Sequence, residues 1–213
     1  MDLKNQMVER AALIWDVDSD LVSMNDGVVS TNGSKNLSMS FKELALEMNS
    51  SGGPIMGRGT VDPKGVGQSF AGLIVDVEID KETGKTQIIK VTCIQDCGKA
   101  IHPSYVEGQM QGGTVQGIGW ALNEEYYMDN QSGMSNNSLL DYRMPTSLDL
   151  PMIGTEIVEV PNPGHPFGVR GVGEVNIVAP PAAIANAIYQ AANIRMEVLP
   201  MNPQAILKKI SGK

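Results

Sequence analysis

Residues 70–94, FAGLIVDVEIDKETGKTQIIKVTCI, carry the clearest structural signal of the chain. Apolar and polar side chains alternate from residue 70 to residue 79, which is typical of a β-strand with one buried face. Residues 81–85 form a turn in which Gly84 is suited to a positive φ, and a second strand returns over residues 87–94. The stretch therefore predicts an antiparallel hairpin.

Helical patterns lie on both sides of this hairpin. Ser40 and Glu43 have the spacing of a capping box, which predicts a helix start at residue 41. Helices are predicted over residues 3–15, 41–48, 103–122, 180–189 and 203–210, the last two with proline in the first turn. Short strands are predicted near residues 28–29, 124–128, 155–160 and 197–199. The mixture predicts an α+β fold of antiparallel hairpins with packed helices rather than a regular βαβ alternation.

A long aperiodic segment separates the first elements from the hairpin. Residues 49–68 hold six glycines and two prolines. A loop of this length is uncommon inside a compact domain. We therefore expect an N-terminal α+β portion over residues 1–56 and a C-terminal portion over residues 57–213.

Composition excludes several classes of protein. The 213 residues hold 16 Lys and Arg against 24 Asp and Glu, a net charge of -8, which argues against nucleic acid as the partner. No apolar run reaches the roughly 18 residues of a membrane span, and the first residues do not resemble a signal peptide. Two cysteines fit a reducing compartment rather than a disulfide framework.

The sequence contains none of the common catalytic or metal-binding motifs. His102 and His165 are the only histidines and lie far apart in sequence, so no metal site is predicted. Cys93 and Cys97 are four residues apart without a second pair, and the simpler interpretation is that they are small buried hydrophobic residues. Phosphate-binding loops and nucleophile elbows are absent.

The helix predicted over residues 103–122 is rich in glycine, at positions 108, 112, 113, 117 and 119. Each glycine costs about 0.5–1 kcal/mol in a helix interior relative to alanine. Such a helix is expected to pack closely against either another backbone or a ligand. Gln109 and Gln116 are seven residues apart and share one side, where they either bind a polar cofactor or simply face solvent.

One isolated carboxylate follows the glycine-rich segment GVRGVG. Glu174 stands after Gly173 and shortly before a predicted helix. Free N–H groups at a helix start suit an anion. Glu174 is therefore either a charge stabilised by the helix dipole or a base that faces a ligand.

Four segments taken together resemble a known family. They are QDCGKAIHPSYVEGQMQGGTVQGIGWALNEE (95–125), LLDYRMPTSLDLP (139–151), GHPFGVRGVGE (164–174) and PPAAIANAI (180–188). In this order they are similar to the C-terminal part of the molybdopterin-binding subunit of the xanthine oxidase and aldehyde oxidoreductase family, the molybdenum hydroxylases. The resemblance is strong over residues 57–213 and looser before them.

The resemblance implies a function and a site. These enzymes hydroxylate purines, N-heterocycles or aldehydes with oxygen derived from water, and Glu174 matches their catalytic base. Gln109 matches a residue beside the cofactor, molybdopterin with molybdenum, expected here in the cytosine dinucleotide form. Gly108, Gly112 and Gly113 are expected to let the helix approach that cofactor, with Gln116 and Gly173 as weaker matches.

The chain also departs from the family pattern. Val175-Asn176-Ile177 stands where many members have proline after the glutamate. The GGxFG-type and glutamine-rich cofactor loops of the family have no match, so an N-terminal molybdenum-binding domain or subunit is expected to complete the site. Iron–sulfur and FAD subunits, a small-molecule substrate and a cytoplasmic location are implied, without nucleic acid or membrane. The isolated chain is then expected to be inactive; a non-catalytic remnant that serves assembly or binding is the alternative.

Overall fold

The computed structural model describes residues 2–32, 36–62, 65, 67–131 and 133–212. Contacts divide the chain into two compact units, Met1–Asp62 and Pro63–Lys213. This division and the boundary expected after residue 56 fall within the same glycine-rich segment.

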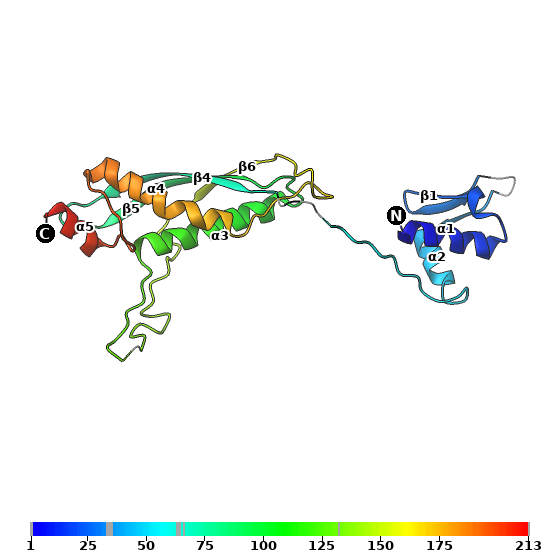
Figure 1. Ribbon diagram of the computed structural model, residues 1–213, viewed down its shortest axis with the longest axis horizontal. Helices are drawn as coiled ribbons and strands as arrows, with labels where there is room; N and C mark the ends of the chain where they lie inside the picture. Colours follow the sequence, from blue (N-terminus) through cyan, green and yellow to red (C-terminus); the bar gives the residue numbers. More distant parts are fainter. Residues whose placement is uncertain (1, 33–35, 63–64, 66, 132, 213) are drawn as a thin grey trace. The chain divides into compact units, whose positions relative to one another are not determined.

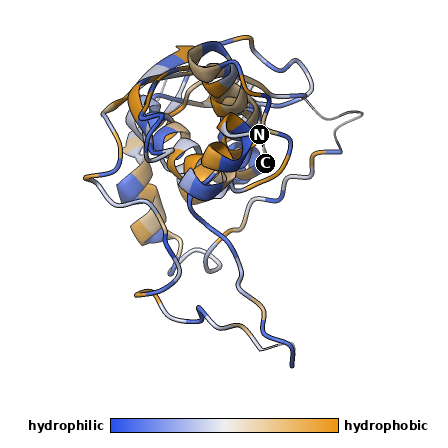
Figure 2. Ribbon diagram, turned by 90° about the vertical axis from the view of Figure 1, so that its left-hand side faces the viewer, coloured by the Kyte–Doolittle hydropathy of each residue, from blue (hydrophilic) through white to orange (hydrophobic). Residues whose placement is uncertain are grey.

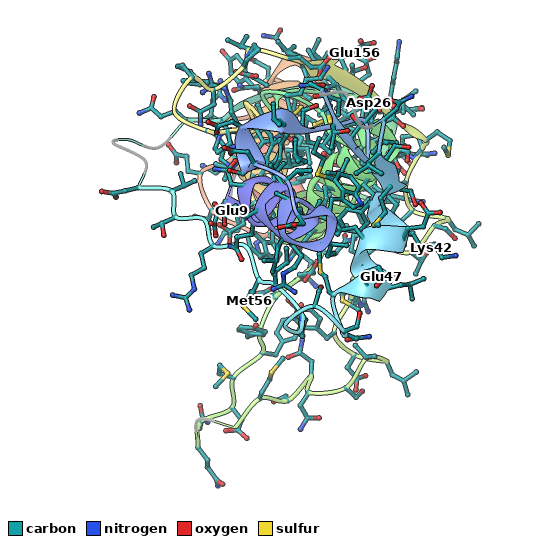
Figure 3. The ribbon with its side chains drawn as sticks, turned by 90° about the vertical axis from the view of Figure 1, so that its right-hand side faces the viewer. Glu9, Asp26, Lys42, Glu47, Met56 and Glu156 are labelled. Atoms are coloured by element: carbon teal, nitrogen blue, oxygen red, sulfur yellow. The ribbon has the colours of Figure 1, made fainter. Side chains whose placement is uncertain are left out.

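The first unit packs two helices on a small sheet. Its elements are α1 (Asp2–Trp15), a 3-10 turn (Ser19–Leu21), β1 (Val22–Asn25), β2 (Val28–Thr31), β3 (Ser38–Ser40) and α2 (Phe41–Glu47). The strands are antiparallel in the order β1-β2-β3. Ser40 and Glu43 form the expected capping box at the start of α2. Figure 3 labels Glu9, Lys42 and Glu47, whose exposed side chains lie outside the core of this unit.

The second unit is built on the predicted hairpin. Its elements are β4 (Phe70–Ile79), β5 (Thr86–Asp96), α3 (Pro103–Leu122), β6 (Ile153–Val158), α4 (Val175–Ala192) and α5 (Pro203–Ile210). β4 and β5 pair antiparallel from Phe70 opposite Asp96 to Ile79 opposite Thr86, and Gly84 in the turn has φ +73°. The hairpin, α3 and α5 confirm the sequence predictions, as does the α+β class.

β6 adds a feature that the sequence did not predict, because it pairs parallel to β5. The sheet order is β4-β5-β6, and α3 lies in the connection between its two parallel strands. α3 and α4 run side by side along the sheet (Figure 1). Figure 2 shows the ribbon turned by 90° and coloured by hydropathy, with hydrophobic and hydrophilic residues both present along the helices. The core between helices and sheet includes Val91, Cys93, Met110, Ile118, Ile184 and Ile188.

Three sequence predictions were wrong in detail. α4 begins at Val175 rather than Pro180, so that Pro180 and Pro181 lie inside the helix. Residues 124–128 form no strand but only an isolated antiparallel bridge of Met128 with Met134, and the buried side chain of Asn136 bonds the backbone of Glu125 and Tyr127 there. No strand forms at residues 197–199 either, where Pro200 follows and removes a backbone donor.

Within the part of the chain that the structure describes, no helix is both long enough and apolar enough to cross a membrane.

Candidate functional site

Two glycines of α3 face α4. A Cβ atom on Gly117 would lie 2.6 Å from Cγ of Pro180 and 2.7 Å from the carbonyl oxygen of Ile177. A Cβ on Gly113 would lie 3.1 Å from Cβ of Asn176. These two glycines therefore allow the two helices to approach, and the neighbour beside Gly113 is α4 rather than open space for a cofactor.

The opposite situation holds at Gly108 and Gly112. Both are exposed, and a Cβ at either position would meet nothing within 4 Å. Gln116 follows one turn after Gly112 and is also exposed. Since residues four apart share a helix face, these three positions form one open strip of α3 with bare backbone in its middle.

Gln109 joins this strip to the loop before α4. Its side-chain oxygen lies 3.6 Å from the position that a Cβ of Gly173 would occupy. A shallow cavity of about 220 Å³ beside it is lined by Tyr105, Gln109 and Val172, among others. The structure thus brings Gln109 next to Gly173 and Glu174, more than sixty residues later in the chain.

Glu174 occupies the N-cap position of α4, with φ -95° and ψ -16°, but its side chain makes no capping hydrogen bond. The side chain is exposed. The carboxylate is therefore not used to complete the helix, although it stands at the helix end that suits negative charge. The geometry therefore leaves the carboxylate exposed and free of a capping hydrogen bond.

The loop that leads to Glu174 is fixed at its start by an ion pair. Arg170 Nε lies 3.2 Å from Asp96 Oδ2 at the end of β5, and both side chains are largely buried. Burial opposes ionisation of Asp96, but N–H groups of Gly98 and Val160 and the charge of Arg170 outweigh it and hold the pKa of that carboxyl below its ordinary value. Arg170 N also donates to the carbonyl of Cys97 at 2.8 Å.

The cysteines and histidines play other parts. Cys93 and Cys97 are free and buried, as expected, and burial raises the pKa of both thiols. His102 stacks on Tyr105 with ring centroids 4.0 Å apart. Among the residues that the structure describes, no group of three His, Cys, Asp or Glu side chains is placed to hold a metal ion.

Sequence reasoning missed the residues that hold the loop: Arg170, Asp96, Gln95 and Asn176. A signal for Gln95 exists, because residues 91, 93 and 95 of β5 and residue 97 just after it are all buried, and an amide interrupts that apolar series. Asn176 gives no such signal, since its burial depends on where α4 begins.

Comparison with known proteins identifies the family. Residues 1–151 match the molybdopterin cofactor-binding domain, and the chain belongs to this family. It is 32% identical over 216 residues to the putative xanthine dehydrogenase molybdenum-binding subunit of Escherichia coli (strain K12). The aligned region covers 97% of this chain and 28% of that protein. It is also 37% identical to the nicotine 6-hydroxylase large subunit of Paenarthrobacter nicotinovorans, over 68% of the chain and 18% of that protein.

Solved structures of similar fold belong to the same family. Cu,Mo-CO dehydrogenase has a TM-score of 0.78 at 25% identity, covering 99% of this chain and 27% of that one. Quinoline 2-oxidoreductase from Pseudomonas putida 86 has a TM-score of 0.78 at 30% identity, and the match covers 98% of this chain and 28% of that one. These matches place the sequence among the molybdenum-binding large subunits of the xanthine oxidase family. The chain spans less than a third of the length of these relatives.

The described residues fit a large planar cofactor. Gly108 and Gly112 leave backbone open where a bulky ring system could lie against α3. Gln109 and Gln116 present exposed amides that both donate and accept hydrogen bonds, as pterin ring atoms require. Gly113 does not contribute to this open surface.

Proposed function

We propose that this chain forms part of the active site of a molybdenum hydroxylase that hydroxylates an N-heterocycle, purine or aldehyde with oxygen derived from water. The observation that carries the proposal is the placement of Glu174. Its carboxylate is exposed, makes no capping bond and stands at the end of a loop that is fixed on β5.

Glu174 acts in this proposal as the general base. A carboxylate oxygen takes a proton from the water-derived nucleophile, and the positive end of the α4 dipole stabilises negative charge at this position. A general base of this kind typically contributes a factor of about 10²–10⁴ to the rate. Molybdopterin, when bound, supplies the redox chemistry and takes two electrons from the substrate.

The remaining proposed site residues orient the cofactor. The Gln109 amide, beside Gly173, can hydrogen-bond a pterin edge, and Gln116 can do the same two turns further along α3. Gly108, Gly112 and Gly173 let the ring system approach the backbone. Gly113 acts indirectly, because it sets the spacing between α3 and the helix that begins at Glu174.

The names of the relatives support the substrate range. They include a nicotine hydroxylase, a quinoline oxidoreductase, xanthine dehydrogenase subunits and aldehyde oxidoreductases. We further propose the cytosine dinucleotide form of the cofactor, which the similarity to CO dehydrogenase supports. Partners in the proposal are an N-terminal molybdenum-binding domain or subunit and iron–sulfur and FAD subunits. A cytoplasmic location is supported by the two free thiols.

The proposal is tested on the complex that contains this chain, purified from its native host. We expect about one molybdenum per chain, cytidine monophosphate after acid hydrolysis of the cofactor, and ¹⁸O in the product when turnover takes place in H₂¹⁸O. Absence of molybdenum from the complex, or product oxygen that comes from O₂, would contradict the proposal. Stoichiometric molybdenum in the isolated chain would contradict the shared site.

A further inference from the structure

Three buried polar side chains meet between β5 and the first turn of α4. Gln95, Asn176 and Cys93 are 0%, 1% and 1% exposed. The Asn176 Nδ2 group donates to Gln95 Oε1, and the Cys93 thiol donates to Asn176 Oδ1 at 3.0 Å. The two amides and the thiol thus form one connected network in the core of the second unit.

Gln95 Nε2 also donates to Ser69 Oγ at 3.3 Å, and two further bonds of this network go to the loop that carries Glu174. Gln95 Nε2 donates to the carbonyl of Gly171 at 2.9 Å, and Asn176 Nδ2 donates to the carbonyl of Val172 at 3.3 Å. These are the residues immediately before Gly173 and Glu174. Two consecutive carbonyl groups are therefore held by side chains from two different elements.

Stability does not explain why amides stand here. Burying two amides costs free energy that their hydrogen bonds only offset, and apolar side chains of similar size are usually at least as stable in a core. What the amides add is direction, because each fixes the orientation of one carbonyl. Together with the Arg170 and Asp96 pair, they tie residues 170–172 to β5 immediately before Glu174.

We propose that Gln95 and Asn176 are positioning residues for Glu174. The network sets the backbone of Gly171 and Val172, and through them the place and direction of the carboxylate at the start of α4. This inference rests on the proposed function of Glu174. A displacement of about 1 Å at a reacting group can cost about 10²-fold in rate, so a fixed loop is what a base on an exposed N-cap needs.

The first test measures the loop in the full chain without any activity. Gln95→Met keeps the size of the side chain and removes its hydrogen bonds, and Asn176→Ala keeps the Cβ that packs on Gly113 and removes the amide. Trypsin cleavage after Arg170 is followed by mass spectrometry, with cleavage after Lys208 as the internal reference. Asn186→Ala is the matched control, since Asn186 is exposed on the same helix and its side chain accepts a hydrogen bond from Arg195, away from the loop.

Either variant is expected to raise the cleavage rate at Arg170 at least about tenfold, while cleavage at Lys208 and the control stay unchanged. In the assembled complex the same variants should lower kcat by about 10²-fold with KM unchanged. Equal acceleration at both cleavage sites, or wild-type kcat in both variants, would overturn the inference. If Gln95→Met does not fold, Asn176→Ala decides alone. A separate result would contradict the proposed function itself, namely full activity of the Glu174→Gln variant.

Discussion

The ring of Pro180 fills the space that a side chain at position 117 would need, with Cγ 2.6 Å from where a Cβ of Gly117 would stand. The contact explains why α3 holds a glycine in its interior at this point, opposite the sixth residue of α4. Gly117→Ala should destabilise the chain by about 1–3 kcal/mol, because the added methyl group overpacks the helix contact. Urea unfolding followed by circular dichroism measures the change.

Gly108→Ala is the matched control for that contact. Position 108 is also helical, but a Cβ there meets nothing within 4 Å. Only the gain in helix propensity remains, so this variant should be about 0.5–1 kcal/mol more stable than wild type. Equal effects at the two positions would show that α3 and α4 do not pack as described.

The open strip of α3 gives a prediction about the cofactor. Gly112→Leu should leave the unfolding free energy close to wild type or raise it, since the position is exposed and open. In the assembled complex the same side chain would occupy the surface that we assign to molybdopterin. The molybdenum content should therefore fall severalfold, as measured by mass spectrometry of the metal. Full molybdenum content in the Gly112→Leu complex would show that the cofactor does not bind at this strip.

The ion pair of Arg170 and Asp96 predicts a pH dependence. The folded chain lowers the pKa of Asp96, so this carboxylate stabilises the fold fully above its unfolded pKa and loses that contribution as pH falls through the lower folded value. Urea midpoints should therefore drop below about pH 4, and Asp96→Asn should flatten part of that drop while lowering stability at neutral pH. Glu78→Gln, at an exposed position of β4, is the control. It should change neither the acid drop of the urea midpoint nor the stability at neutral pH.

The two cysteines should be inert in the folded chain. Both are buried with a raised pKa, so little thiolate is available for alkylation. Iodoacetamide at about pH 8 should modify them at least about a hundredfold more slowly than in urea, by the same pKa and burial argument. Rapid modification of Cys93 in the native chain would mean that the core between β5 and α4 opens far more readily than its packing indicates.

Local patterns predicted the elements that depend on local chemistry. The hairpin and α3 have sharp alternation, a turn glycine and a proline start, and their observed bounds follow these signals. The parallel pairing of β6 with β5 was not predictable, because it joins segments about sixty residues apart through tertiary contacts. The start of α4 was misplaced because proline normally marks the first turn of a helix, whereas Pro180 lies inside α4 and packs on Gly117 of α3.

The candidate site divides in the same way. Glu174 and Gln109 were predicted because ordered motifs carry them, and the structure brings their segments together. The glycines of α3 were treated as one group, yet they serve two purposes, helix packing at Gly113 and Gly117 and an open surface at Gly108 and Gly112. Only the three-dimensional contacts separate these purposes, and only they show the amide network behind Glu174.

The central claim is that Glu174 is the base, and its removal by Glu174→Gln in the purified complex tests it most directly. The side chain is exposed and makes no capping bond, so the unfolding midpoint and molybdenum content should match wild type. Turnover should fall by about 10²–10⁴-fold, whereas Glu156→Gln, an exposed glutamate on β6, should leave it unchanged. Wild-type turnover in the Glu174→Gln complex, with its normal molybdenum content, would contradict the account.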